Sequence, residues 1–174
     1  VTVTPANDAP VITGLDANSV NVYVEDGAPV VIDSNVTISD PELDNNDNWN
    51  GSTLTIVRDG TADPDDVFSS PLITGSNVIV GGVTVGTVTN VGGTLEITFN
   101  TAATNAIADQ VIQSITYETN DSTPTADIDI RYTVNDQNSN INGGGVAGGG
   151  QDQGNGGSLS QTGVINLTIT ANDD

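Results

Sequence analysis

The sequence predicts an all-β protein, an antiparallel β-sandwich with one short helix and a glycine-rich loop. Three observations lead to this prediction: the apolar residues are chiefly Val and Ile, apolar and polar residues alternate in short runs, and turn residues separate the runs. β-Branched side chains suit pleated strands better than helices. Alternation places one face of a strand in the core and the other in water.

Each predicted strand is a short run bounded by turn residues such as Gly81-Gly82 or Gly92-Gly93. In one of these runs Leu95, Ile97 and Phe99 alternate with polar residues, which indicates a half-buried strand. The expected strands cover residues 9–15, 18–24, 29–39, 52–57, 77–80, 82–91, 94–99, 114–119, 126–134 and 163–170.

Two segments depart from the strand pattern. Residues 104–115 carry apolar side chains at helical spacing, with Thr104 or Asn105 placed to cap, so a short helix is expected there. Residues 141–157 contain nine glycines in 17 positions. Such a run buries too little surface to offset its ordering entropy, so we expect a mobile or extended hairpin loop.

The charge of the chain excludes several classes of partner. The 174 residues include 23 Asp and Glu but two basic residues, Arg58 and Arg131, and the net charge is −21. Nucleic acid and anionic membrane surfaces are therefore not expected as partners. There is no Cys or His, so disulfides and thiolate metal sites are excluded, and no apolar run is long enough for membrane insertion.

The acidity has two interpretations. One is solubility or salt adaptation. The other is that carboxylates grouped at strand ends bind a hard divalent cation, which takes six to eight oxygen ligands in the case of calcium. Because loops at one end of a sandwich meet, we expect Asp40 and Glu42 to join Glu25 and a terminal Asp around such an ion. Asp136, just after a strand, is a further candidate ligand.

The two ends of the chain have similar sequences, VTVTPANDAP at 1–10 and LTITANDD at 167–174. The corresponding Asp residues are 173 − 8 = 165 positions apart. This is typical of one unit in a row of similar units. Residues 1–8 are then the end strand and linker of a preceding repeat, 9–171 form the sandwich, and 172–174 start the next linker.

The chain resembles the cadherin-like tandem repeats of large secreted bacterial adhesins, many of which carry calcium-binding RTX-type repeats elsewhere. The resemblance rests on five segments in order, at residues 7–12, 22–44, 108–120, 131–138 and 168–173. It implies a cadherin or immunoglobulin-like sandwich with calcium (Ca²⁺) at the junctions between repeats.

The resemblance also implies a ligand set. The family's early acidic residue is matched by Glu25, its Asp-x-Glu by Asp40 and Glu42, and its linker pairs by residues 7–8 and 172–173. The later Asp-x-Asp is matched only loosely by residues 127 and 129, and the Asn-rich insert at 44–50 is expected to hold an ion of its own. The candidate metal ligands are thus Asn7, Asp8, Glu25, Asp40, Glu42, Asp44, Asp47, Asp136, Asn172 and Asp173.

The function implied is that of a structural repeat in an extracellular adhesin stalk or biofilm matrix fibre at the bacterial cell surface. Its partners would be adjacent repeats of the same polypeptide, and neighbouring chains in a fibre. The alternative is a calcium-dependent carbohydrate-binding module that recognises surface glycans through Trp49 and the Tyr residues. An enzyme is not expected, because acids confined to strand-end turns suit cation binding better than a cleft with paired catalytic carboxylates.

Overall fold

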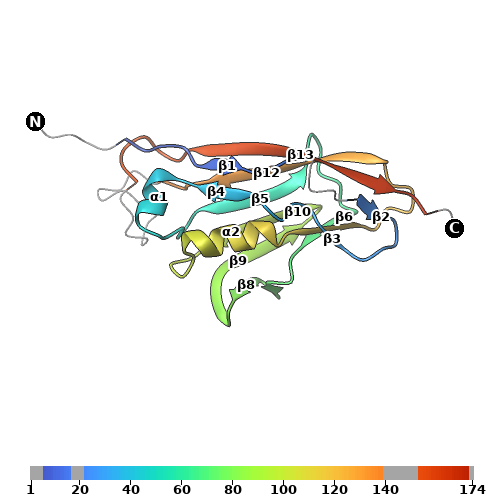
Figure 1. The fold of residues 1–174 in the computed structure, drawn as a ribbon, viewed down its shortest axis with the longest axis horizontal. Helices are drawn as coiled ribbons and strands as arrows, with labels where there is room; N and C mark the ends of the chain where they lie inside the picture. The colour runs from blue at the N-terminus through green and yellow to red at the C-terminus, as the bar shows by residue number, and fades with distance from the viewer. Residues whose placement is uncertain (1–5, 17–21, 139–152, 173–174) are drawn as a thin grey trace, which may run out of the picture.

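The largest sheet runs along the long axis of the computed structural model, which describes residues 6–16, 22–138 and 153–172 (Figure 1). Its eight strands lie in the order β2-β13-β12-β5-β10-β9-β8-β7. Their bounds are β2 (Val22–Val24), β13 (Ser160–Thr170), β12 (Asp127–Asn135), β5 (Thr53–Arg58), β10 (Thr94–Phe99), β9 (Val83–Val91), β8 (Asn77–Val80) and β7 (Ile73–Thr74). Neighbours are antiparallel, except that β2 pairs in parallel with β13.

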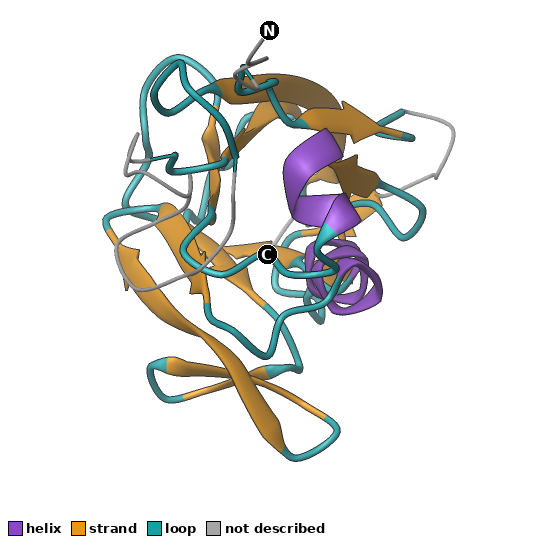
Figure 2. Ribbon diagram, turned by 90° about the vertical axis from the view of Figure 1, so that its left-hand side faces the viewer, coloured by secondary structure: helices purple, strands orange, loops and turns teal. Residues whose placement is uncertain are grey.

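Two smaller sheets complete the all-β sandwich. One contains β3 (Val30–Val31), β11 (Thr116–Thr119) and β6 (Asp66–Ser69), and the other pairs β1 (Val11–Thr13) with β4 (Thr37–Ser39). Seen along the long axis, the strands surround the core, both helices lie on one side, and the hairpin of β8 and β9 projects from the body (Figure 2). The predicted fold class is confirmed.

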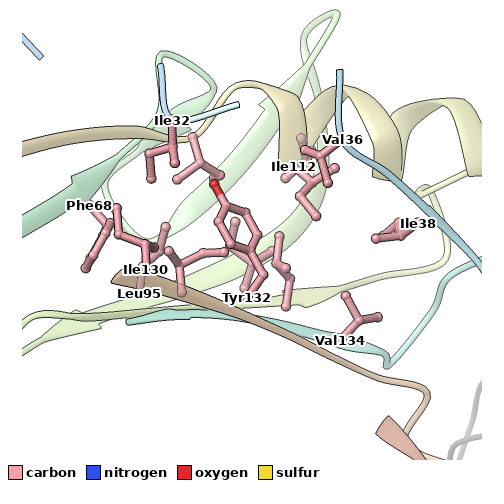
Figure 3. Packing of buried hydrophobic residues seen from close by; sticks show 14 of the residues in the cluster. Ile32, Val36, Ile38, Phe68, Leu95, Ile112, Ile130, Tyr132 and Val134 are labelled. Atoms are coloured by element: carbon pink, nitrogen blue, oxygen red, sulfur yellow. The ribbon is translucent and has the colours of Figure 1, made fainter. Parts of the chain in front are cut away.

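The core is filled by the alternate residues that the sequence pattern indicated. On β12 the side chains of Ile128, Ile130, Tyr132 and Val134 are buried, whereas the residues between them are not. Figure 3 shows Tyr132 in the middle of this cluster, between β12 and the segment that carries Ile32. All six aromatic residues of the chain are buried: Tyr23, Trp49, Phe68, Phe99, Tyr117 and Tyr132.

The predicted helix is present as α2 (Asn105–Gln113), with Thr104 as its N-cap. A second helix, α1 (Pro41–Asn45), was not predicted. Its sequence carries the usual start signals: the Asp40 side chain accepts backbone N–H groups of the first turn, and Pro41 fixes a helical φ where no hydrogen bond is lost. The acidic stretch after β4 therefore contains a helix of five residues in addition to the predicted one, within a fold that is mostly strand.

The predicted strand at 29–39 is divided into β3 and β4. The cause is Asp33, which is buried and whose Oδ1 accepts the N–H groups of Asn35 and Val36 at 2.9 and 3.0 Å. This side chain forms a local turn that competes with strand pairing. In the part of the chain that the structure describes, no helix is long and apolar enough to cross a membrane.

Candidate metal centre

Asp136 is the centre of a hydrogen-bond network at one end of the molecule. It directly follows β12 and is fully buried. Its Oδ1 accepts the backbone N–H groups of Asn138 and Leu159 at 3.0 and 2.9 Å. Its Oδ2 accepts the side-chain amide of Asn7 at 2.6 Å. Asp136 therefore connects the linker residue Asn7 to the loop after β12 and to the approach to β13.

Residues 153–157, the last part of the glycine-rich run, contact Asn7 as well. The Asn7 backbone N–H donates to the Asn155 carbonyl at 2.8 Å, and its Nδ2 donates to the Gly157 carbonyl at 2.9 Å. Gly156 has a φ of +147°, and a Cβ there would lie 3.4 Å from the Asn7 Cβ. Glycine permits both this backbone conformation and this close approach.

The glycine-rich run at 141–157 lies between β12 and β13, and the structure describes its last five residues. Residues 141–152 lie outside the described residues, and Gln153 and Gly154 are buried. The Asn138 side-chain amide donates to the Gly154 carbonyl at 3.0 Å. The predicted hairpin connection is found, because β12 and β13 pair antiparallel on either side of it, and a polar side chain of the body binds the backbone at its end.

Asp40 contributes a buried carboxylate to the same end. Its Oδ1 caps α1 by accepting the N–H groups of Glu42 and Leu43, both at 3.0 Å. Burial raises the pKa of Asp40 to about 6, and the negative charges of Glu42 and Asp136 act in the same direction. A cation beside this carboxylate would favour its charged form and reverse the shift.

Four buried oxygen atoms at this end have no hydrogen-bond donor: Asn7 Oδ1, Asp40 Oδ2 and Gln153 Oε1, and also Asp44 Oδ1, whose other oxygen accepts the Asp40 N–H. In each group the other polar atom is fixed. Asn7 Nδ2 donates twice, Asp40 Oδ1 caps α1, and Gln153 Nε2 donates to the Asp136 carbonyl at 3.3 Å. A buried acceptor left without a donor costs about 1–3 kcal/mol. Carboxylate and amide oxygens are the ligands that calcium takes, so this donor set fits the ion.

Glu42 and Asp8 lie at the solvent side of this cluster. Glu42 is half-buried and Asp8 is exposed, and the Asp8 backbone N–H lies 3.4 Å from Glu42 Oε2. The linker therefore lies beside Glu42 at this end of the molecule, and ion binding by Glu42 and Asp8 stays a prediction. Among the described residues, no three carboxylates are grouped as a metal site by themselves. The oxygens gathered here come from amides as well as acids.

Asp44 and Asp47 connect the two helices. Asp44 Oδ2 accepts the Asp40 backbone N–H at 3.1 Å, and Asp47 Oδ1 accepts the Asn105 N–H at the start of α2 at 2.9 Å. Burial raises the pKa of Asp44, and the charges of Asp109 and Asp47 add to the effect. An ion bound by Asp44 and Asp47 remains a prediction, while their contacts to the backbone show a structural role.

Glu25 lies at the opposite end of the molecule. It directly follows β2, which Figure 1 places far from α1, and its Oε2 accepts the Asn172 backbone N–H at 3.0 Å. The expectation that Glu25 joins Asp40 and Glu42 is wrong, because the chain traverses the body through β3 and β4 between them. Of the two linker residues at 172–173, Asn172 contacts Glu25 through its backbone N–H. Asp173 lies outside the described residues.

Asp127 and Asp129 lie on the exposed face of β12. Their side chains accept hydrogen bonds across the strand pair, Asp127 from Thr168 at 3.1 Å and Asp129 from Asn166 at 3.0 Å. They contact neither group of candidate ligands through any of these bonds. The two residues that loosely match the Asp-x-Asp of cadherins thus lie on the solvent-exposed face of β12.

Two residues of this end were missed by sequence reasoning. Asn138 had a local signal, since it lies two positions after Asp136 in a loop where Asp side chains commonly accept a backbone N–H. Gln153 had none, because its contact with the Asp136 carbonyl depends on how the glycine-rich run returns to the body. Comparison with known proteins identified no relative, since no family model, curated protein or solved structure matches the chain.

Proposed function

We propose that this chain is a calcium-binding structural repeat of an extracellular adhesin stalk or matrix fibre at the bacterial surface. The observation that carries the proposal is the set of unpaired buried oxygens of Asn7, Asp40 and Gln153 beside the linker. The cluster lies where the chain enters the sandwich, so a bound ion would fix the direction in which a preceding repeat projects. Calcium supplies positive charge to this acidic end, and the protein supplies the oxygens.

The arrangement of the two ends supports a row of repeats. Helix α1 lies at one end of the long axis, whereas β2, which Glu25 follows, and the C-terminal end of β13 lie at the other (Figure 1). The Asn-Asp pairs at 7–8 and 172–173 are 165 residues apart in the sequence. A following repeat would therefore place its own Asn-Asp pair between Glu25 of one unit and the buried cluster of the next.

The proposed role is mechanical. Adjoining domains keep hinge freedom unless something fixes the linker. Here Asn7 already binds Asp136, Asn155 and Gly157. An ion bound to its unpaired Oδ1 would hold the linker to the body by one more contact. Each repeat would then hold the next at a fixed angle, as in other solenoid-like arrays.

The alternative of a glycan-binding module has no support from the aromatic residues. Sugar recognition uses exposed aromatic faces, but Trp49 is fully buried and its Nε1 donates to Asn105 Oδ1 at 3.1 Å. The remaining aromatic side chains are in the core as well. Trp49 fluorescence is therefore a reporter of folding rather than of ligand contact.

Thermal unfolding with added calcium, added magnesium or a chelator tests the proposal. A ligand that binds only the folded state stabilises it by about 2.7 kcal/mol at a hundredfold excess over Kd. We expect calcium to raise Tm and magnesium to do so poorly, because a flexible all-oxygen site suits the larger ion. Asp40→Asn is expected to remove most of the calcium effect, and Asp65→Asn, in an exposed turn, to retain it. An identical Tm in chelator and in millimolar calcium would exclude the proposal.

A further inference from the structure

We propose that Gln153 supplies an oxygen ligand to the cation site, so that the glycine-rich run of this chain completes the site from within the repeat. This inference rests on the proposed function, since it names a further ligand for the same ion. It differs from the ligand set expected from the sequence, in which every oxygen came from carboxylates or from the linker pairs.

The burial of Gln153 is the first reason. Its side chain is fully buried although it lies within the glycine-rich run, and glutamine is usually exposed. Its Nε2 donates to the Asp136 carbonyl at 3.3 Å, while Oε1 has no donor. The amide is thus held by its nitrogen, and the oxygen that remains is the atom that a cation uses.

The neighbours of Gln153 are the second reason. The Asp136 carbonyl that fixes its amide belongs to the residue that binds Asn7, the other buried amide with an unpaired oxygen. The Asp136 charge also contributes to the raised pKa of Asp40, which places the third unpaired oxygen in the same electrostatic environment. These three unpaired oxygens therefore belong to two amides that bind Asp136 through their nitrogens and to one carboxylate that is affected by the Asp136 charge, while the carboxylate of Asp136 itself is occupied by donors.

The backbone around Gln153 is built to hold it there. The Gln153 and Gly154 carbonyls accept from the Asn138 side-chain amide at 3.5 and 3.0 Å. Two residues further on, Asn155 pairs with the linker through its carbonyl. Gln153 is therefore fixed between the loop after β12 and the linker, and ion binding to its oxygen would tie the glycine-rich run to the junction.

Calcium titration of the whole chain by calorimetry tests the assignment. Wild type is compared with Gln153→Ala, Gln153→Glu and the control Gln110→Ala, whose side chain is exposed on α2. We expect Gln153→Ala to weaken calcium binding at least tenfold and Gln110→Ala to leave it unchanged. Gln153→Glu retains an oxygen at the site and adds charge, so we expect it to bind calcium at least as tightly as wild type while it lowers Tm in chelator.

A purely structural Gln153 predicts a different result. Both substitutions would then lower Tm in chelator. Gln153→Ala, which removes the oxygen, and Gln153→Glu, which keeps one, would not differ in calcium affinity. The side-chain amide resonance of Gln153, assigned by its loss in Gln153→Glu, is a second readout that does not require the alanine variant to fold. It must shift on addition of calcium if Oε1 is a ligand.

Calcium binding by the chain and ligation of the ion by Gln153 can be tested separately. If wild type binds no calcium, the proposed function is excluded and this inference with it. If wild type binds calcium, Asp40→Asn weakens binding and Gln153→Ala does not, the site is real but Gln153 is not a ligand. An unshifted Gln153 amide resonance in calcium leads to that same conclusion.

Discussion

The side-chain amide of Asn7 donates to Asp136 Oδ2 at 2.6 Å, and the two residues are 129 positions apart in the sequence. This contact joins the linker to a fully buried carboxylate of the sandwich. Asn7 is also held by the backbone of Asn155 and Gly157. The linker is therefore bound to its own repeat on two sides, and its direction is set by the folded body rather than by linker composition alone.

The first prediction concerns Asp136. Asp136→Ala leaves the N–H groups of Asn138 and Leu159 and the amide of Asn7 without their acceptor, so the free energy of unfolding is expected to fall by about 3 kcal/mol. Asp129→Ala is the control, because its side chain is exposed, and about 0.5 kcal/mol or less is expected there. Urea unfolding in chelator measures both. Equal losses would show that Asp136 has no special structural role.

A second prediction compares the two arginines. Arg58 makes two charged hydrogen bonds to Asp66, at 2.6 and 2.7 Å, and Asp66 is buried and also accepts from Tyr117 at 2.8 Å. Arg58→Ala leaves that carboxylate without its cation, which is expected to cost about 3–5 kcal/mol. Arg131 pairs with Asp59 at 2.9 Å on the surface, so Arg131→Ala is expected to cost less than about 1 kcal/mol.

Unfolding of both variants in chelator and in calcium provides the measurement. Neither arginine contacts the candidate ligands through the bonds described, so calcium is expected to stabilise both variants as much as wild type. A small effect of Arg58→Ala would contradict the assignment of Asp66 as a buried charge that depends on one partner.

Much of the fold could be predicted because local patterns decide it. The alternation in residues 94–99 and 126–134 gave the strands of the largest sheet, and the spacing of Val111 and Ile112 gave α2. The division of 29–39 into two strands depends on one buried side chain, Asp33, which binds the backbone of its own turn. α1 carried a visible signal in Asp40-Pro41, but helix start signals are easily missed before so short a helix.

The candidate site was predicted less completely, for a topological reason. The contact of the linker with Glu42 and Asp136 agrees with the expected grouping of strand-end acids. Which end of the sandwich each strand end reaches depends on chain path, and this separated Glu25 from Asp40. The amide of Gln153 contacts the Asp136 carbonyl across 17 positions of sequence, a contact that composition alone does not encode.

A third prediction concerns pH. The pKa of Asp40 is raised from 3.8 to about 6 by burial and by the negative charges of Glu42 and Asp136. Between these two values the calcium-free folded state binds more protons than the unfolded state. Its free energy of unfolding should therefore fall as pH rises from about 4 to 6, by about 2–3 kcal/mol from this group. Asp40→Asn removes this component, so the difference between the two unfolding curves isolates it.

Calcium binding should have the opposite pH dependence to the stability of the calcium-free protein. An ion that binds the charged carboxylate releases the proton, so calcium affinity should rise with pH up to about 6 and then level off. Titrations at pH 5, 6 and 7 in wild type and Asp40→Asn measure this. An affinity that is independent of pH in wild type would mean that Asp40 is not a ligand.

The last prediction tests the row of repeats with Glu25. In a protein of two identical repeats, Asn172 and Asp173 of the first serve as the linker pair of the second. Glu25 of the first repeat then accepts a backbone N–H of that shared linker. In the single chain its Oε2 accepts the Asn172 N–H at 3.0 Å. Glu25 of the second repeat faces a terminal end with no successor. The same substitution, Glu25→Gln, is therefore expected to have different effects in the two positions.

In the first repeat Glu25→Gln removes a carboxylate charge from the junction, so we expect weaker calcium binding there and a shorter, more flexible particle in calcium. In the second repeat it removes the same charge from a free end, and the junction should be unchanged. Small-angle scattering, with calcium and with chelator, reads the maximum dimension of each protein, and calorimetry reads the affinity. Wild type and the second-repeat variant should lengthen together in calcium, whereas the first-repeat variant should not. If all three proteins have the same maximum dimension in calcium and in chelator, the ion does not fix the linker, and the repeats are joined flexibly whether or not they bind calcium.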